Sequence, residues 1–413
     1  MFAYKSILTG IWRCFLLCSM ISIQAYAGND KLTDEEVGFL VEVAVEAGKR
    51  IQKNWLENRL LDEKDRSKYR YQEPDKENEQ LKPDGSSVTS ADKESDDYIN
   101  KLLSESKHRR LRDLPRISEE SKYPSLDKRK KYERYILIDP LDGTSKFKKG
   151  EVEKVSVFIV VLDKVDDDRG GAKPIFSILH RPFERSSGDV GEGLMVEDGV
   201  TLYGGEDYGI KVRYSGEEKY TLDKDEVPVT HLGQLCSVTV TESTLNSRLS
   251  HYLQKLGCEV DSPEELSGEL FTVDGFSVEP ELKRLPSVSK FFAMIGMTER
   301  GQHRIVRQAT ENIHAHICLG ISEDKESDQT QKSWAPEEVD VAVMHALGIP
   351  LGIHFYDING DELRYNKRKH LKMGHHIGLA VKADGFRELF PKELWSEEVV
   401  EGKGLEDNGN DSE

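Results

Sequence analysis

The sequence predicts a protein that contains both helices and strands, because segments with helical periodicity and segments with strand character follow one another along the chain. From Val37 to Ile51, apolar residues recur at intervals of three and four, which is the spacing of one helix face. The runs 135–138 and 155–162 are short, apolar and rich in branched or aromatic residues, which favours buried strands. With 413 residues, of which 37% are hydrophobic, the chain can form one large domain or two modest ones.

The first 27 residues differ in composition from the rest of the chain. Two basic residues and no acidic ones accompany an apolar core at 14–23, and Ala25-Tyr26-Ala27 then supplies small residues suited to a cleavage site. This order is typical of a secretory signal peptide, so we expect an exported protein, periplasmic or secreted, with Gly28 as its mature N-terminus. The apolar core is shorter than the about 20 residues of a transmembrane helix, which predicts no stable membrane span and leaves an uncleaved signal anchor as the alternative.

Two helices are expected in the first part of the mature chain. Thr33 and Glu36 match the capping-box pattern, so the first helix should begin near Thr33. The second helix should cover residues 90–103, whose apolar positions share one face. Between the two, the stretch 57–84 is crowded with charge and contains two prolines, which favours a long polar loop or an insertion.

Further elements are expected downstream of the strand at 155–162. Runs with strand character, bounded by turn residues, predict strands at 174–179 and 236–241. A polar segment with several glycines predicts hairpins within 192–218. Helical spacing predicts helices at 245–256, 287–296 and 339–347. The polar segments 321–333 and 401–413 are expected to lack regular structure.

Charge and cysteine content exclude several classes of ligand. The formal net charge is −18 at pH 7, and removal of residues 1–27 with their two basic side chains would make it −20. An acidic chain of this kind argues against nucleic-acid polymers and anionic membranes as partners. The mature chain shows no cysteine and histidine spacing typical of a zinc site. Its three cysteines could form one disulfide, but the sequence does not specify it. The three cysteines are Cys236, Cys258 and Cys318. We interpret three histidines, His314, His316 and His345, as ordinary core or surface residues and not as metal ligands.

The stretch Asp139-Pro140-Leu141-Asp142-Gly143-Thr144 directly follows the strand expected at 135–138. Two carboxylates therefore leave a strand end three residues apart, where their oxygens can bind a hard divalent cation. Gly143 lets the backbone approach a ligand, and Thr144 can begin a helix whose free N–H groups attract an anion. From spacing alone the alternative is a solvated turn, because Asp and Gly are common turn residues.

Four segments, spread over residues 84–366, resemble motifs of the inositol monophosphatase superfamily, which includes the 3'(2'),5'-bisphosphate nucleotidases. They are the hexapeptide with its surroundings (135–147), a glutamate motif (117–121), a V-T-x-x-D segment (87–92), and Asp340, which lies 17 residues before Asp357. The resemblance is closest to the nucleotidase branch, and the four segments occur in the order that the family shows.

The resemblance implies an inositol monophosphatase-like phosphatase fold, an α/β sandwich of five alternating layers (αβαβα). Residues 1–27 would then be the signal peptide, 28–400 the phosphatase domain and 401–413 an acidic disordered tail. Within the domain, a metal-binding half would cover about 28–185 and a substrate half about 186–400.

The resemblance also implies a Mg²⁺-dependent phosphomonoesterase with two or three bound ions. Two metal ions about 4 Å apart can activate a water and neutralise phosphate oxygens. The metal ligands that it implies are Glu119, Asp139, the Leu141 carbonyl, Asp142 and Asp340. The catalytic residues that it implies are Asp92, Glu119 and Thr144, and the phosphate-binding N–H groups are those of Gly143, Thr144 and Ser145.

One metal ligand departs from the family pattern. Asp340 follows a valine, whereas the family usually has Trp-Asp at this point. Trp334 lies six residues earlier, so an alternative alignment places Glu337 or Glu338 near the metals. The distance to Asp357 favours Asp340.

The segment 287–291 bears on the substrate. It resembles the G-S-x-x-K-F segment of bisphosphate nucleotidases, although Pro286 replaces the glycine. Ser287 and Lys290 are therefore expected in the substrate site, since a lysine is a compact cation suited to a second phosphate. The alternative for Lys290 is a solvated helix residue.

The expected reaction converts a small phosphorylated metabolite, a 3'(2'),5'-bisphosphate nucleotide, to the 5'-nucleotide and phosphate. One alternative is an inositol monophosphate or sugar phosphatase, which export would favour. A second alternative is an inactive family member that acts as a binding module. A homodimer is possible, but the sequence does not determine the oligomeric state. It does not determine lithium sensitivity either.

Overall fold

The computed structural model describes the chain in thirteen stretches and divides it into two compact units, Met1–Phe39 and Leu40–Glu413. The boundary lies inside the first described helix. The stretches described are 31–61, 69–72, 88–183, 199–214, 217–222, 236–240, 271–273, 276–278, 313–317, 337–357, 361–367, 371 and 379–381.

Helix α2 (Asp34–Asn58) begins where its capping residues predict. The Thr33 backbone N–H donates to Glu36 Oε2 at 2.9 Å, and the Glu36 N–H donates to Thr33 Oγ1 at 3.2 Å. These two reciprocal bonds satisfy N–H groups that the first turn leaves without helical partners. The predicted start at Thr33 is confirmed.

A two-stranded ribbon follows α2 where the sequence predicted only a loop. Strands β1 (Arg59–Leu61) and β2 (Tyr69–Tyr71) pair antiparallel, so the prediction of a polar loop or insertion without strands was wrong for these residues. The Tyr71 ring packs 4.7 Å from the Phe147 ring and 6.3 Å from the Trp55 ring. Burial of an aromatic side chain therefore outweighs the polar composition of the segment.

The main sheet has seven strands in the order β3-β4-β5-β6-β7-β8-β9. β3 runs parallel to β4, and all other neighbours are antiparallel. The strands are β3 (Arg116–Ser118), β4 (Arg134–Asp142), β5 (Ser156–Lys164), β6 (Ala172–Arg181), β7 (Val200–Gly205), β8 (Gly209–Tyr214) and β9 (Glu217–Leu222). The strands predicted at 135–138, 155–162 and 174–179, and the hairpins within 192–218, are confirmed.

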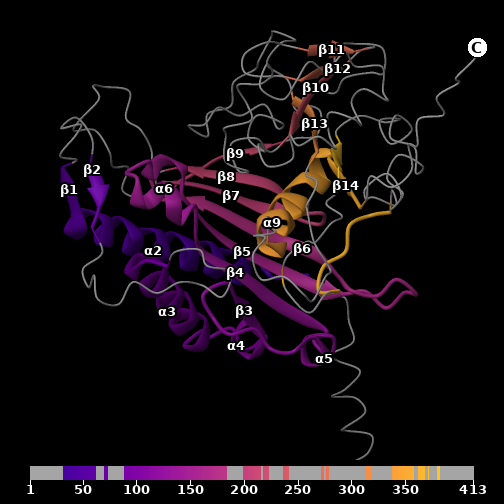
Figure 1. The fold of residues 1–413 in the computed structure, drawn as a ribbon. Helices are drawn as coiled ribbons and strands as arrows, with labels where there is room; N and C mark the ends of the chain where they lie inside the picture. Colours follow the sequence, from indigo (N-terminus) through magenta and orange to yellow (C-terminus); the bar gives the residue numbers. More distant parts are fainter. Residues whose placement is uncertain are drawn as a thin grey trace, which may run out of the picture. The chain divides into compact units, whose positions relative to one another are not determined.

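Helix α9 (Glu338–Gly348) packs on one face of this sheet against β4, β5, β6 and β7 (Figure 1). Tyr135 and Leu137 of β4 belong to the apolar core on that face. Because strand side chains alternate, Ile136 and Ile138 point to the other face, and α3 (Ser90–Ser104) contacts β4. Helices thus cover the sheet as an α/β fold requires, and the predicted helices at 90–103 and 339–347 are confirmed.

The remaining described elements are short helices and a second sheet. The helices are α4 (Arg109–Asp113), α5 (Leu126–Arg129), α6 (Thr144–Lys148), η2 (Val152–Lys154) and η7 (Ile349–Leu351). The second sheet has six strands in the order β11-β12-β10-β13-β15-β14. They are β10 (Cys236–Val240), which confirms the strand predicted at 236–241, β11 (Phe271–Val273), β12 (Phe276–Val278), β13 (Ile313–Ile317), β14 (His354–Tyr356) and β15 (Leu379–Val381).

Several predicted features lie outside the described residues. They are the signal peptide at 1–27, the helices at 245–256 and 287–296, the polar segments 321–333 and 401–413, the residues Ser287 and Lys290, and the side chains of the three mature cysteines. Among the helices that the structure describes, none combines the length and the apolar character needed to cross a bilayer. The predicted division into a metal-binding and a substrate half stays a prediction.

Candidate functional site

A β-bulge brings Asp139 and Asp142 to the same face of the sheet. Asp139 pairs with Phe158 and Asp142 with Ser156, so three steps along β4 match two steps along β5. In a regular strand, residues three apart point to opposite faces, and one extra residue reverses this relation. Pro140 lies within the irregular stretch, which tolerates a residue without an N–H donor.

The bulge corrects one detail of the sequence analysis. The hexapeptide was expected to leave the strand in a turn at Asp139, but β4 continues to Asp142. The turn begins only at Gly143, whose φ of 86° lies in the left-handed region. A Cβ at this position would also make a tight contact of 3.1 Å with the Lys154 carbonyl oxygen, so both the backbone conformation and the space favour glycine here.

Three of the predicted metal ligands converge. Asp139, Asp142 and Asp340 each place a carboxylate oxygen within 4.8 Å of the other two. Asp139 is only 2% exposed, whereas Asp142 and Asp340 are half-buried. Carboxylates this close repel one another strongly when water is excluded, and a divalent cation offsets that repulsion. A donor set made only of carboxylate oxygens fits Mg²⁺ better than zinc.

The start of α9 explains why Asp340 belongs to this cluster. The Glu337 N–H donates to Asp340 Oδ2 at 3.0 Å, which fixes Asp340 in the first turn of the helix. The side chains of the alternative alignment have other partners. Glu337 Oε2 accepts a hydrogen bond from the Tyr123 hydroxyl at 3.1 Å, and the Glu338 carboxylate accepts the Asn366 N–H at 2.9 Å. The geometry therefore favours Asp340 over Glu337 and Glu338.

Glu119, the fourth carboxylate expected at the metals, stands outside the group of three. Its backbone lies at the end of β3, and its N–H donates to the Ile138 carbonyl at 3.0 Å. The residue after Ile138 is Asp139, so Glu119 begins next to the cluster although its half-buried carboxylate is not within the 4.8 Å group. Its role as a metal ligand and catalytic residue stays a prediction.

The Leu141 backbone is also part of the predicted ligand set. The Leu141 N–H donates to Asp139 Oδ1 at 2.9 Å, which orients the Asp139 carboxylate. The Leu141 carbonyl lies 3.3 Å from Thr144 Oγ1. The bulge thus holds the two aspartates and the predicted carbonyl ligand in one short stretch of chain.

Asp92 and Thr144 form a direct hydrogen bond across 52 residues. Thr144 Oγ1 donates to Asp92 Oδ1 at 2.7 Å, and Asp92 is fully buried. The other carboxylate oxygen of Asp92 accepts the Thr89 N–H at 2.8 Å and the Thr89 hydroxyl. Since its hydrogen is donated to Asp92, the Thr144 hydroxyl keeps lone pairs that can accept a hydrogen bond from water.

Three side chains on one face of α3 make hydrogen bonds to three separate segments around this site. Besides Asp92, Ser95 Oγ donates to the Pro140 carbonyl at 2.8 Å, and Asp96 Oδ1 accepts from Ser118 Oγ at 2.6 Å. Burial raises the pKa of Asp96, and hydrogen bonds from Ser118 and Ser121 act in the opposite direction. The sequence analysis missed Ser95 and Asp96. Their spacing of three and four residues from Asp92, on one helix face, was the pattern that could have indicated them.

The predicted phosphate-binding groups lie at the start of α6. The helical hydrogen bonds begin with Lys146, whose N–H donates to the Gly143 carbonyl at 2.8 Å. The N–H groups of Thr144 and Ser145 precede that first bond, as the first N–H groups of a helix do. Ser145 is exposed and Thr144 is half-buried, so a ligand can reach this turn. Phosphate binding by these N–H groups stays a prediction.

Comparisons with known proteins agree with these motifs. The model of the inositol monophosphatase family matches residues 33–263, more than half of the chain. The chain is 33% identical over 103 residues to a 3'(2'),5'-bisphosphate nucleotidase CysQ of Haemophilus influenzae, which covers 25% of this chain and 34% of that protein. It is 24% identical over 175 residues to the protein of the same name from Aggregatibacter actinomycetemcomitans, covering 41% of this chain and 55% of the relative.

The matched stretches therefore span about a third to about half of the length of these curated relatives. Among solved structures, the chain is similar to CysQ from Bacteroides thetaiotaomicron, described as a bacterial member of the inositol monophosphatase family. The TM-score is 0.48 at 16% identity, over 85% of this chain and 98% of that one. On the family model, which spans the bulge, the α3 face and the Asp92–Thr144 pair, the chain belongs to the inositol monophosphatase family.

Proposed function

We propose that this protein is a Mg²⁺-dependent phosphomonoesterase. The observation that carries the proposal is the convergence of Asp139, Asp142 and Asp340 within 4.8 Å, next to the Asp92–Thr144 pair. Mg²⁺ held by these carboxylates would neutralise phosphate oxygens and lower the pKa of water. Membership of a phosphatase family makes this chemistry the most direct use of the cluster.

The residues of the chain supply the positioning. The Asp92 carboxylate is held by Thr89 and accepts the Thr144 hydroxyl hydrogen, so the Thr144 oxygen presents lone pairs in a fixed direction. A water that donates to this oxygen is oriented for attack on phosphorus. Because Asp92 is fully buried and fixed, little reorganisation is needed when the water reacts.

The substrate that we propose is a 3'(2'),5'-bisphosphate nucleotide. The curated relatives carry the name of that activity, although the matches cover only part of their length. In this chain Lys290 is the cation assigned to the second phosphate, because the segment 287–291 resembles the corresponding nucleotidase segment. Inositol 1-phosphate, which has only hydroxyl groups at that position, is the natural comparison substrate.

The test is phosphate release from adenosine 3',5'-bisphosphate, inositol 1-phosphate and a sugar phosphate, each with Mg²⁺ and with EDTA. Activity only with Mg²⁺, and highest on the bisphosphate, is the expected result. Lys290→Ala should raise KM for the bisphosphate by roughly 10- to 150-fold, the effect of a hydrogen bond to a charged group, and leave inositol 1-phosphate unchanged. No hydrolysis of any substrate, with Mg²⁺ still bound, would indicate an inactive binding module.

We also propose that the protein is exported, on the composition of residues 1–27 alone. N-terminal sequencing of protein from the native host should begin at Gly28. A cytosolic chain that keeps Met1 would contradict export, and it would also remove the support that export gives to the inositol monophosphate or sugar phosphatase alternative.

A further inference from the structure

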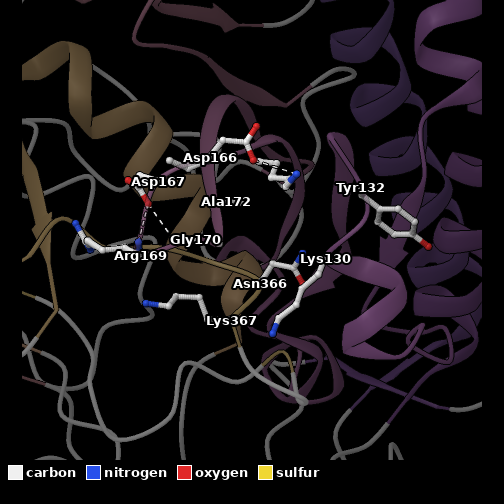
Figure 2. Close-up of a pocket in the computed structure, with 12 residues that line it drawn as sticks. Lys130, Tyr132, Asp166, Asp167, Arg169, Gly170, Ala172, Asn366 and Lys367 are labelled. Carbon is white, nitrogen blue, oxygen red and sulfur yellow. Dashed lines mark hydrogen bonds and ion pairs between the residues drawn. The ribbon is translucent and has the colours of Figure 1, made fainter. Parts of the chain in front are cut away.

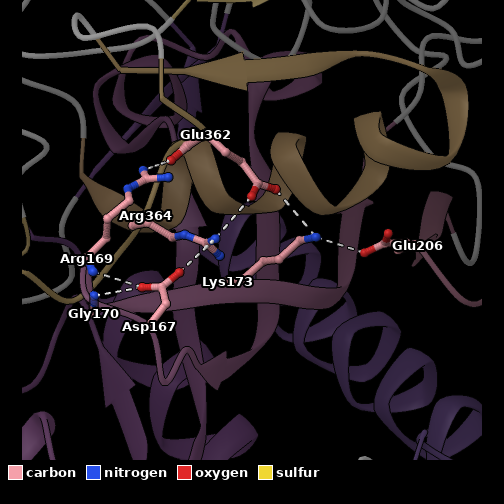
Figure 3. Close-up of polar contacts among 7 residues, drawn as sticks. All are labelled: Asp167, Arg169, Gly170, Lys173, Glu206, Glu362 and Arg364. Atoms are coloured by element: carbon pink, nitrogen blue, oxygen red, sulfur yellow. Dashed lines mark hydrogen bonds and ion pairs between the residues drawn. The ribbon is translucent and has the colours of Figure 1, made fainter.

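Polar contacts at the Lys164 end of β5, the end away from the aspartates, fix the turn between β5 and β6. Asn366 and side chains of both charges line a pocket of about 400 Å³ there (Figure 2). Beside it, Asp167 lies 3.6 Å from the Arg364 guanidinium, which also contacts Glu362 at 3.2 Å (Figure 3). These opposite charges pair within the fold, so the network connects the turn to the segment 362–366.

A second polar network surrounds Asp96 on α3 and reaches the segment that carries Glu119. Asp96 is 7% exposed. Ser118 Oγ donates to Asp96 Oδ1 at 2.6 Å, and Ser121 Oγ donates to Asp96 Oδ2 at 3.3 Å. One buried carboxylate thus binds two hydroxyl groups that flank Glu119 and Glu120 in the sequence.

Glu119 and Glu120 occupy the two central positions of a β-turn. The Ser121 N–H donates to the Ser118 carbonyl at 3.1 Å, which closes the turn. The two oxygens of the Asp96 carboxylate therefore bind the first and the last residue of this turn. Because both ends are bonded to one side chain of α3, the turn is fixed against that helix.

The same turn is bonded to β4. The Glu119 N–H donates to the Ile138 carbonyl at 3.0 Å, and the residue after Ile138 is Asp139. The Glu119 backbone therefore lies beside the strand that carries the aspartates, and Glu120 is one residue further along the turn. The orientation of the turn about this bond determines which glutamate faces the aspartates, and Asp96 fixes that orientation.

The Asp96 side chain is itself held in place. Asn100 Nδ2 donates to Asp96 Oδ1 at 2.9 Å, and Arg116 Nη1 donates to the Asn100 carbonyl at 2.9 Å. Both ends of β3 are therefore bonded to α3. Asp92 lies four residues before Asp96, which is about 6 Å along the helix axis. One helix thus holds both the hydroxyl proposed to orient water and the turn that carries Glu119.

We propose that Asp96 is a positioning residue for Glu119. It holds the turn 118–121 so that the carboxylate of Glu119, and not that of Glu120, becomes a Mg²⁺ ligand beside the three aspartates. Asp96 acts through the two serine hydroxyls and not by binding the metal. The inference rests on the proposed function, in which Mg²⁺ occupies the carboxylate cluster.

The test is a double-mutant cycle, measured by calorimetric titration of the full-length protein with Mn²⁺. Asp96→Ala and Glu119→Gln should each weaken Mn²⁺ binding by about 10- to 100-fold, the usual effect of losing a ligand's orienting partner. The double variant should bind no more weakly than Glu119→Gln, because Asp96 acts only through Glu119. Asp97→Ala, which removes an exposed acid of the same helix, and Glu120→Gln, in the same turn, are the matched controls and should change nothing.

Two further variants separate positioning from charge and from stability. Asp96→Asn removes the charge but can still bond both hydroxyls through its amide oxygen and N–H₂ group, so Mn²⁺ affinity should stay close to that of wild type. Ser118→Ala removes the shorter of the two hydroxyl bonds and should weaken Mn²⁺ binding by about tenfold. Thermal unfolding in EDTA checks that each variant folds, and Ser118→Ala keeps the test valid if Asp96→Ala does not.

Four outcomes overturn the inference. They are Mn²⁺ affinity in Asp96→Ala and Ser118→Ala equal to wild type, an Asp96→Ala effect that adds fully to that of Glu119→Gln, equal weakening by Asp96→Asn and Asp96→Ala, and unchanged affinity in Glu119→Gln. Wild-type protein that binds Mn²⁺ and hydrolyses no phosphomonoester would contradict the proposed function but not this inference.

Discussion

At the Ser156 end of β5 lie three aspartates, whereas at its Lys164 end lysines and an arginine surround a buried asparagine. The acidic end is built largely from one short stretch, because Asp139 and Asp142 belong to the same bulge. The basic end is built from three stretches, at 130–132, 164–172 and 366–367. The two aspartates that share one stretch could be recognised from the sequence, whereas the pocket, which three stretches form, was not predicted.

The largest expected effect is at the acidic end. Asp139→Asn keeps the shape of a nearly buried side chain but removes its charge. Turnover with Mg²⁺ should fall by roughly three to four orders of magnitude, because metal-ion stabilisation of the transition state supplies several kcal/mol. The matched control is Asp127→Asn, an exposed acid on α5. Activity of Asp139→Asn within tenfold of wild type would remove the aspartates from the mechanism.

A somewhat smaller loss should follow Asp340→Asn. This side chain is half-buried and also caps α9, so an amide can keep the cap while losing the charge. We expect a decrease of about two to three orders of magnitude in turnover, together with weaker Mn²⁺ binding measured by calorimetry. Glu337→Gln serves as the comparison and should be nearly silent. If the two variants exchange behaviour, the Trp334 alignment is correct and the Asp340 assignment is wrong.

Thr144→Val tests the pair that spans the two helices. The substitution is close in volume and removes the hydroxyl that donates to Asp92. A loss of about 100-fold in kcat is expected, with Mn²⁺ affinity unchanged, because the proposed role of this hydroxyl is to orient water. A parallel loss of metal affinity would show instead that Thr144 supports the metal ligands.

A smaller effect is expected from the α3 face. Ser95→Ala leaves the buried Pro140 carbonyl without its donor, which loosens the bulge between the two aspartates. Mn²⁺ affinity should fall by about tenfold, in line with the cost of one buried unsatisfied acceptor. Ser125→Ala, an exposed serine whose side chain makes no capping bond to α5, is the control. Unchanged metal affinity with a lowered Tm would limit Ser95 to a structural role.

The last expected effect is on stability, not on activity, and concerns the core around His345. His345 is fully buried, accepts or donates one hydrogen bond to the Tyr365 hydroxyl at 3.0 Å, and stacks on Phe355. Burial lowers the pKa of His345 to about 3, and Lys173 and Arg364 act in the same direction. The sequence analysis interpreted this histidine as a core or surface residue, and the core position is confirmed.

This shift predicts a pH dependence of stability. Between the ordinary pKa of 6.5 and about 3, the unfolded chain binds a proton that native His345 does not. The free energy of unfolding should therefore fall as pH falls through this window, by at most about 2 kcal/mol from pH 6.5 to 5. Urea unfolding of wild type and His345→Gln at both pH values measures it. Equal pH dependence in the two proteins would contradict the assignment.

The sequence determined the features that depend on neighbouring residues. The capping box at Thr33, the helical face from Leu40 to Ile51 and the strand at 135–138 all follow from local rules of hydrogen bonding and side-chain alternation. The spacing of Asp139 and Asp142 by itself left two alternatives, a metal site and a solvated turn. Local sequence patterns predict these elements correctly because each rule involves only residues that are close together in the sequence.

The tertiary structure decided what distant segments do to one another. Pairing with β5 places an extra residue between Asp139 and Asp142, and this register, absent from the sequence, turns both carboxylates to the α9 face. Contacts with Tyr123 and Asn366 occupy Glu337 and Glu338 and leave Asp340 for the cluster. Ser95, Asp96 and Asn366 owe their roles to partners more than 20 residues away, and hydrogen-bond partners at that distance are fixed only when the chain is folded.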